Sequence, residues 1–238
     1  MNKWLFLMAL LSTGVAHAAP PTSEGIDSKD YQWNADDSEK VEALSRRGDA
    51  RNGQAVYELC RACHLPSGAG RPDGSFPQLA GQHSTVLIKQ MADIRAGLRD
   101  NPMMFPFAAS LVDPQELADA AAYISSLCIP RDHGQYDGAD GAIQVTKGRE
   151  LYEKECLECH GKTGEGNKEN FYPVIAGQHY RYLLRQMREI RDGKRRNANP
   201  DMVRIIRKYD NQQLVAISAY QSSLVMPGAM CEVSPRKR

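Results

Sequence analysis

The chain has 238 residues, of which 42% are hydrophobic and 25% are charged, and its mean hydropathy is −0.52. These values are typical of a globular protein that is long enough for one large core or two small ones. The formal net charge is only +1, so the composition does not indicate a protein that binds nucleic acid, which usually carries a large basic excess.

The first 18 residues have the pattern of a Sec-type signal peptide. Lys3 gives a positive start, residues 4–11 are apolar, and residues 16–18 form a cleavage site of the small-x-small type. The apolar run is shorter than the roughly 20 residues that span a bilayer, and no arginine pair precedes it. We therefore predict cleavage after Ala18 and a mature protein in the periplasm, where disulfides persist.

Most of the remaining chain is a tandem repeat. A shift of 96 residues aligns many identical or similar positions of the two halves. The matching segments are Ser67–Gly70 with Thr163–Gly166, Phe76–His83 with Tyr172–His179, and several single positions between Leu87 and Gly97 with those between Leu183 and Gly193. We predict an acidic lead-in over 19–45, extended or loosely ordered up to Asp37, a first domain over 46–130, a linker over 131–145, a second domain over 146–228 and a basic tail over 229–238.

Each repeat is expected to form three main helices, and no alternating pattern predicts a strand. The second helix is the clearest, because Leu87, Met91 and Ile94 follow one face of a 3.6-residue helix. The predicted ranges are about 50–62 and 146–158 for the first helix, up to Gly97 and Gly193 for the second, and from the capping residues Asp113 and Asp210 to about 127 and 224 for the third. A domain of this size has a small core, so a large apolar cofactor would supply much of the missing core.

Four of the six cysteines carry the clearest chemical signal. They form two Cys-x-x-Cys-His motifs, made by Cys60, Cys63 and His64 and by Cys156, Cys159 and His160. This motif is typical of covalent haem c attachment, in which two thiols on one side of a helical turn bond the vinyl groups and the histidine becomes the proximal iron ligand. A zinc site would need a second ligand pair nearby, and a thioredoxin-type motif would need a βαβ context. We predict two covalently bound haem c groups.

With these motifs the chain resembles the cytochrome c4 family, in which a class I cytochrome c domain is duplicated. The resemblance covers about residues 46–127 and 146–225. Besides the two motifs, it rests on the Phe-Pro-x-Leu-Ala-Gly-Gln-like blocks at 76–82 and 172–178, on the Asn-Pro-x-Met-like stretches and on the Ala-Tyr pairs at 122–123 and 219–220. It implies an all-α fold of two tandem class I domains, each wrapped around a covalently bound haem.

The resemblance also implies that a methionine before the last helix of each domain is the second axial ligand. Met202 is the only methionine at this place in the second repeat. Met104 fits the Asn-Pro-x-Met form in the first repeat, and the adjacent Met103 stays an alternative. His83 and His179 repeat as well and would give bis-histidine ligation. The family does not use this position, and we expect hydrogen bonds at the surface or within a turn there instead.

Two further pairs of repeated residues have roles that the resemblance implies. Pro77 and Pro173 match a proline whose carbonyl accepts a hydrogen bond from the proximal histidine, which fixes the ring. Gly53 and Gly148 match a small residue that lets the last helix cross the first one closely. These roles concern the positioning of the haem ligand and the packing of the helices.

Cys128 and Cys231 are left over, and each follows the closing helix of one repeat. In an oxidising compartment, an even leftover pair predicts a disulfide that joins the two domains. The sequence alone gives no distance between the two residues, which a disulfide requires to be short.

The charge is divided unevenly between the halves. Residues 19–130 carry 10 basic and 15 acidic side chains, whereas residues 131–238 carry 19 and 14. Much of the basic excess lies between Arg181 and Lys208. A solvated helix face and a docking surface for an acidic partner both fit this pattern.

The predicted function is outer-sphere electron transfer by a periplasmic dihaem cytochrome that is an electron carrier and not an enzyme. One alternative is a cytochrome subunit of a larger periplasmic dehydrogenase. Another is a catalytic dihaem enzyme of the peroxidase or thiosulfate-oxidising type, which would need an iron with a weak or missing sixth ligand. We expect periplasmic or membrane-bound donor and acceptor oxidoreductases as partners, no nucleic acid, and association with a membrane surface as an open alternative.

Overall fold

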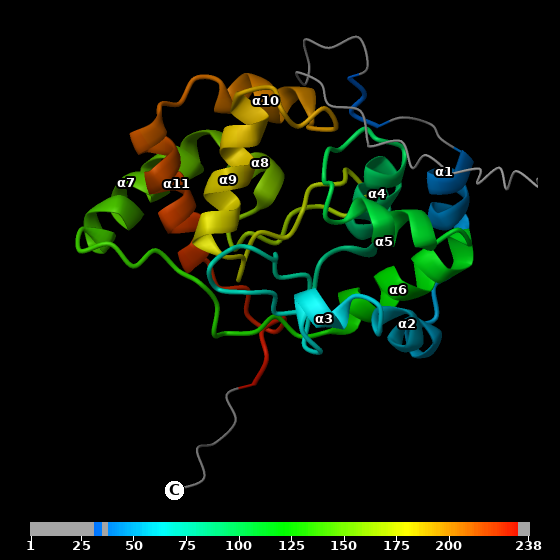
Figure 1. The fold of residues 1–238 in the computed structure, drawn as a ribbon. Coiled ribbons are helices and arrows are strands. Elements are labelled where there is room, and N and C mark those ends of the chain that lie inside the picture. The colour runs from blue at the N-terminus through cyan, green and yellow to red at the C-terminus, as the bar shows by residue number, and fades with distance from the viewer. Residues whose placement is uncertain (1–30, 35–37, 233–238) are drawn as a thin grey trace, which may run out of the picture.

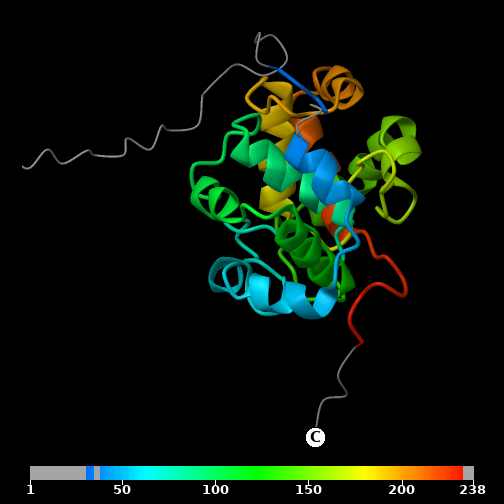
Figure 2. The same ribbon diagram turned by 90° about the vertical axis from the view of Figure 1, so that its right-hand side faces the viewer.

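The structure is a computed structural model that describes residues 31–34 and 38–232. The predicted signal peptide over 1–18, most of the acidic lead-in and the end of the basic tail lie outside the described residues. The described chain folds into eleven α-helices, with no strand beyond two isolated bridges. The two repeats form two helical lobes that lie side by side (Figures 1 and 2). None of these helices combines the length and the apolar character that crossing a membrane requires.

The two lobes follow one another along the chain and use the same order of elements. The first contains α1 (Ser38–Ser45), α2 (Ala50–Tyr57), α3 (Arg61–His64), α4 (Ser84–Arg95), α5 (Phe105–Ser110) and α6 (Pro114–Ser126). The second contains α7 (Gly141–Glu155), α8 (Leu157–His160), α9 (Tyr180–Arg191), α10 (Pro200–Ile206) and α11 (Asn211–Ser223). This arrangement is the predicted all-α fold with two tandem domains.

The closing helices α6 and α11 begin where the capping residues predict. The side chain of Asp113 accepts a hydrogen bond from the backbone N–H of Gln115. Asp210 and Gln213 form a reciprocal capping box at the start of α11. These bonds satisfy backbone N–H groups that have no partner in the first turn of a helix.

Two glycines allow the first and last helices of each lobe to cross closely. A Cβ atom at Gly53 would lie 1.9 Å from the carbonyl oxygen of Asp119, and one at Gly148 would lie 1.9 Å from that of Ala216. Any larger side chain would push α2 away from α6, or α7 away from α11. The packing role predicted for both glycines is therefore confirmed.

The first helix of each repeat differs from its prediction. The helix expected over 50–62 ends at Tyr57, because the next three N–H groups bond to carbonyls three residues earlier, the last being Cys60 N–H to Tyr57. In the second repeat α7 begins at Gly141, inside the linker predicted over 131–145, and the N–H groups of Ile143 and Gln144 donate to the carbonyl of Asp140.

Three short helices were not predicted. Residues 38–45, at the end of the predicted lead-in, form α1, whose Ala43 is fully buried. Helices α5 and α10 have six and seven residues, which is too short for a periodic pattern to be recognised. Helix α1 packs against α4 and α6 of the first lobe.

Two glutamines join the lobes by equivalent hydrogen bonds. The side chain of Gln82 accepts from the backbone N–H of Val174 and donates to its carbonyl, both at 2.9 Å. Gln178 forms the same pair with the backbone of Gln78, at 3.0 and 2.9 Å. Since Val174 is equivalent to Gln78 in the repeat, the two pairs are related by an approximate twofold axis, and all four bonds are buried.

A short segment after α6 closes the junction. Cys128 and Cys231 form the predicted disulfide, with their Cα atoms 4.8 Å apart. Next to it, the fully buried Ile129 contacts positions where Gly81 and Gly177 leave room for its side chain. The disulfide therefore connects the lobes covalently, and Ile129 adds apolar packing between them.

Candidate functional site

The first Cys-x-x-Cys-His motif forms one tight helical turn. Cys60 precedes α3, and the N–H of His64 donates to its carbonyl at 3.0 Å. The His64 ring is buried, and its Nδ1–H donates to the carbonyl of Pro77 at 3.0 Å. Burial lowers the pKa of His64, against the opposing effect of the Pro77 carbonyl, so the ring is neutral near pH 7. Its Nε2 is buried without a hydrogen-bond partner in the described structure, which fits a nitrogen whose partner is a metal.

The second motif repeats this geometry. The N–H of His160 donates to the carbonyl of Cys156 at 2.9 Å, and its ring Nδ1 lies 3.4 Å from the carbonyl of Pro173. Burial also lowers the pKa of His160, with the Pro173 carbonyl opposing it. Both prolines therefore have the positions predicted for them. Tyr152 fixes the end of the turn through a hydrogen bond to the carbonyl of Gly161 at 2.8 Å.

None of the four motif cysteines takes part in a disulfide. Over the described residues, no three His, Cys, Asp or Glu side chains come together in a group that could hold a metal ion. The motifs therefore do not build a metal site from protein ligands, whereas their donor set fits haem c.

Both motif turns border one cavity of about 950 Å³ that extends between the lobes. Its walls include apolar side chains at equivalent positions, among them Leu87 and Met91 in the first lobe and Leu183 and Met187 in the second. A space of this size at the interface of two domains is typical of a cofactor site. The apolar walls and the buried histidine nitrogen fit a large, flat, mostly apolar group.

Met104 and Met202 border the same cavity and have equivalent backbone settings. The N–H of Met104 lies 3.2 Å from the side-chain oxygen of Asn101, and that of Met202 lies 3.4 Å from the side-chain oxygen of Asn199. Met103 also borders the cavity, but it is 60% exposed. The shared asparagine contact makes Met104 the structural equivalent of Met202.

His83 and His179 make contacts between the lobes. Nε2–H of His83 donates to the carbonyl of Glu165 at 2.8 Å, and that of His179 donates to the carbonyl of Ala69 at 2.9 Å. Burial lowers the pKa of His179, against the opposing effect of the Ala69 carbonyl. The expected surface or turn hydrogen bonds are therefore replaced by bonds to the opposite lobe, and His179 is fully buried.

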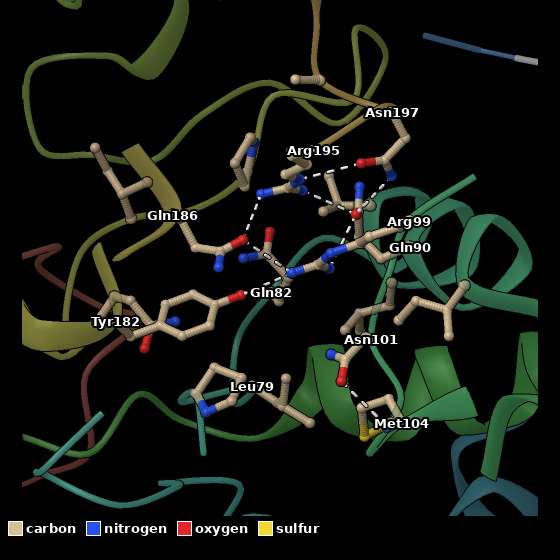
Figure 3. Close-up of a pocket in the computed structure, with 18 of the residues that line it drawn as sticks. Leu79, Gln82, Gln90, Arg99, Asn101, Met104, Tyr182, Gln186, Arg195 and Asn197 are labelled. Atoms are coloured by element: carbon tan, nitrogen blue, oxygen red, sulfur yellow. Dashed lines mark hydrogen bonds between the residues drawn. The ribbon is translucent and has the colours of Figure 1, made fainter. Parts of the chain in front are cut away.

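A polar cluster that the sequence analysis did not identify also lies in this cavity (Figure 3). Arg99 and Arg195 form its centre and bond to Gln90 and Gln186. Each of these residues is 96 positions from its equivalent, so the repeat could have identified the cluster. The basic segment predicted as a solvated helix face or a docking surface includes Arg195, whose side chain lines the cavity instead. The next residue, Arg196, is 1% exposed.

Comparison with known proteins agrees with the fold and the motifs. The family model described as cytochrome c matches residues 50–128 and 145–224. Cytochrome c4 of Azotobacter vinelandii is 32% identical to this chain, and the match covers 94% of this chain and 100% of that protein. A protein of Stutzerimonas stutzeri named thiosulfate dehydrogenase electron acceptor is 32% identical over 74% of this chain and 88% of its own. Among solved structures, reduced recombinant cytochrome c4 from Pseudomonas stutzeri matches with a TM-score of 0.65 and 30% identity, over 75% of this chain and all of that one.

Proposed function

Because this chain belongs to the cytochrome c4 family of dihaem electron-transfer cytochromes, we propose that it works in the periplasm as a carrier of single electrons and is not an enzyme. Two covalently bound haem c groups are its cofactors. The observation that carries the proposal is the equivalent placement, in both lobes, of a buried motif histidine and a methionine on the wall of one cavity.

Four cysteines would hold the haems. Cys60 and Cys63 would bond the vinyl groups of one haem, and Cys156 and Cys159 those of the other. The short turns α3 and α8 place each histidine directly after its second cysteine. When bound, each haem supplies an iron that alternates between the ferrous and ferric states.

The axial ligands would be His64 with Met104 in the first lobe and His160 with Met202 in the second. The proline carbonyls orient the two rings and keep the proton on Nδ1, so Nε2 is available as a ligand. With a histidine and a methionine holding each iron, no iron position would stay open to a substrate, and the bound haems would supply one-electron transfer. A thioether ligand also favours the reduced state more than a second imidazole does.

Two observations support the periplasm as the place of action. One is the predicted signal peptide that ends at Ala18, and the other is the Cys128–Cys231 disulfide, because such bonds persist in oxidising compartments. The partners would be redox proteins that deliver and accept electrons, either dissolved in the periplasm or bound to the membrane.

A second candidate function is a permanent cytochrome subunit of a periplasmic dehydrogenase. It is favoured by the similarity to a protein named as the electron acceptor of thiosulfate dehydrogenase. Gel filtration of a native extract separates the two candidates, because a free carrier elutes near the size of the 26.5 kDa chain and a subunit elutes with its enzyme.

The axial ligands are tested by the weak red absorption band that ferric His–Met haem shows and bis-histidine haem lacks. Met202→His and Met104→His should each remove about half of this band and lower the potential of one haem. Met103→Leu is the matched control and should leave the band intact. Loss of half the band in Met103→Leu would assign the ligand to Met103 instead. A native protein without the band, or one that turns over peroxide or thiosulfate, would contradict the carrier function.

A further inference from the structure

Helix α4 carries an ion pair that is shut off from water. The ammonium group of Lys89 donates to the carboxylate of Asp93 one turn later, and both side chains are 0% exposed. The ring of Trp33 covers the ammonium group, with 4.4 Å between the ring centre and the nitrogen. In the second lobe the equivalent side chains, those of Arg185 and Glu189, are 43% and 37% exposed. Burial of this pair is therefore a feature of the first lobe alone.

Hydrogen bonds connect the ion pair to the cavity between the lobes. The side-chain amide of Asn197 donates to Oδ2 of Asp93 at 2.7 Å and to Oε1 of Gln90 at 3.0 Å. The oxygen of the same amide accepts from Nε of Arg195 at 3.1 Å. Asn197, Gln90 and Arg195 all line the cavity (Figure 3). Only one side chain therefore separates the carboxylate of the pair from groups that border the cofactor space.

The ion pair lies in a cluster with an excess of positive charge. The charges of Arg195, from the second lobe, and of Lys40, on α1, both act against that of Lys89. Lys40 is itself only 1% exposed. Like charges held together away from water favour the loss of a proton from one of them. Arginine keeps its proton in proteins, whereas a buried lysine gives it up readily.

The carboxylate does not fully compensate this charge. Within the described residues, Asp93 is the only carboxylate that bonds to Lys89, and its Oδ1 is buried without a hydrogen-bond partner there. Helix α5, which packs against α4, has no ionisable side chain. The other ionisable side chains of α1 and α6 are engaged elsewhere or exposed: Glu39 with Arg95, Glu42 with Arg46, Asp119 with the N–H of Asp49, Tyr123 with the ring of Tyr57, and Glu116 at the surface.

These surroundings make the proton on Lys89 sensitive to charge in the cavity. Burial lowers the pKa of Lys89 to about 8, and the attraction of Asp93 opposes this only in part. Reduction of a bound haem adds one negative charge, which raises the pKa of a nearby ammonium group. The coupling is reciprocal, so the proton on Lys89 favours the reduced state by the same factor.

We propose that Lys89 is a proton-exchanging group of this cytochrome, which binds a proton when a haem in the cavity is reduced and releases it on oxidation. The inference rests on the proposed function, because it requires bound haem. Reduction takes one electron from the donor protein and a proton from the solvent, and oxidation returns the electron to the acceptor and the proton to the solvent. Asp93 and Trp33 hold the amine in place, so Lys89 acts through its charge and is not an iron ligand.

The test compares the overall reduction equilibrium of the haem-loaded protein at pH 7 and pH 9. Two unit charges about 12 Å apart, at an effective dielectric constant of about 20, change each other's equilibria about tenfold. For a group whose pKa is about 8, such a coupling lowers the overall equilibrium constant for reduction about fivefold over this range. An optical redox titration measures this change. A pH-indicator dye in weak buffer measures the proton uptake directly, and about half a proton per protein is expected near pH 8.5.

Two lysine-to-arginine variants separate Lys89 from its surroundings. Lys89→Arg keeps the positive charge but exchanges no proton in this range, so the pH dependence and the dye signal should both disappear. Lys40→Arg is the matched control, because Lys40 is also buried and belongs to the same cluster, and it should keep both effects. If Lys89→Arg does not retain both haems, the double variant Lys89→Met with Asp93→Asn replaces it, since a buried ion pair often tolerates uncharged side chains of similar volume. It should lose both effects as well.

The contradicting outcomes are distinct. A native protein with the same reduction equilibrium at pH 7 and pH 9 would overturn the proposal, and so would a Lys89→Arg variant with the native pH dependence. Loss of the pH dependence in Lys40→Arg would assign the proton to Lys40 instead. Loss of the weak red band between pH 7 and pH 9 would show ligand exchange at an iron and would contradict a role through charge. A protein without two reversible one-electron steps would contradict the proposed function, whereas one that has both steps but no pH dependence contradicts this inference alone.

Discussion

Ile129 offers the sharpest test of how the two lobes are joined. Its side chain is fully buried. A Cβ atom at Gly81 would lie 2.7 Å from its Cγ1 atom, and one at Gly177 would lie 2.3 Å from its Cγ2 atom. The Ile129 N–H donates to the carbonyl of Ala229, and its carbonyl accepts from Cys231. The residue therefore fills a space that both repeats leave open by having glycine at the same position.

Ile129→Ala should lower the free energy of unfolding by about 3 kcal/mol, within the roughly 2–5 kcal/mol typical of such truncations in a core. The loss combines the removed apolar contacts with the cavity that remains between the lobes. The measurement is guanidinium-induced unfolding of the haem-loaded protein, followed by far-UV circular dichroism. Ile143→Ala is the matched control, because Ile143 is 56% exposed, and it should change the free energy of unfolding by less than about 0.5 kcal/mol.

A double-mutant cycle makes the reasoning stricter. Gly177→Ala alone should destabilise the protein by about 2–4 kcal/mol, because the new methyl group meets Ile129 and the backbone φ of +70° is unfavourable for alanine. In the double variant with Ile129→Ala the contact is relieved, while the backbone cost remains. The sum of the two single losses of stability should therefore exceed the loss in the double variant by at least 1 kcal/mol. Additive effects, or an Ile129→Ala variant as stable as Ile143→Ala, would refute the packing described for this junction.

Three further changes test other parts of the molecule. Replacing Cys128 and Cys231 together by serine should lower the free energy of unfolding by about 2–5 kcal/mol, measured as a lower guanidinium midpoint, because the bond closes a long loop; an unchanged midpoint would contradict this role. Gly148→Ala should clearly lower the thermal midpoint of unfolding, because a Cβ atom there would meet the backbone of α11. Gly141→Ala is the control and should leave the midpoint unchanged, because the nearest atom to its Cβ would be 3.8 Å away. Equal midpoints for the two variants would refute the close crossing. Arg188→Glu should slow electron exchange with an acidic partner at low ionic strength, measured by stopped flow, and the effect should fade near 0.1 M salt, where the Debye length is about 10 Å; equal rates at low salt would favour a merely solvated face.

Local signals in the sequence were sufficient for the closing helices and the two motif turns. Asp113 and Asp210 cap helices in the way their side chains predict, because a capping bond needs only residues two or three positions away. The disulfide was also predictable, since Cys128 and Cys231 were the only cysteines outside the motifs. These features depend on short-range chemistry or on simple counting.

The environment of helix α4 was not predictable in the same way. Lys89 and Asp93 are spaced like an exposed ion pair on a helix surface, yet both side chains are fully buried. Trp33 lies over the Lys89 ammonium group, 4.4 Å from ring centre to nitrogen. Burial lowers the pKa of Lys89 to about 8. No pattern within α4 indicates that a residue more than 50 positions earlier covers it.

The second repeat shows what this covering changes. Arg185 and Glu189 occupy the positions equivalent to Lys89 and Asp93, and their side chains are 43% and 37% exposed. The same helix therefore presents a buried ion pair in one lobe and an exposed basic surface in the other, next to Arg181 and Arg188. The sequence shows a charged pair in both repeats, and the residues that contact the buried one, Trp33 and Asn197, both lie far from it in the chain.

A residue can recur at equivalent positions of a duplicated chain for either of two physical reasons. Each lobe can need it for its own haem, as with the motif histidines, or the junction between the lobes can need it twice. Gln82 and Gln178 belong to the second kind, because each bonds to the backbone of the opposite lobe. Arg99 and Arg195 combine both reasons, since they border the cofactor cavity and cross the junction. The repeat therefore encodes the pairing of the two lobes together with the two haem sites.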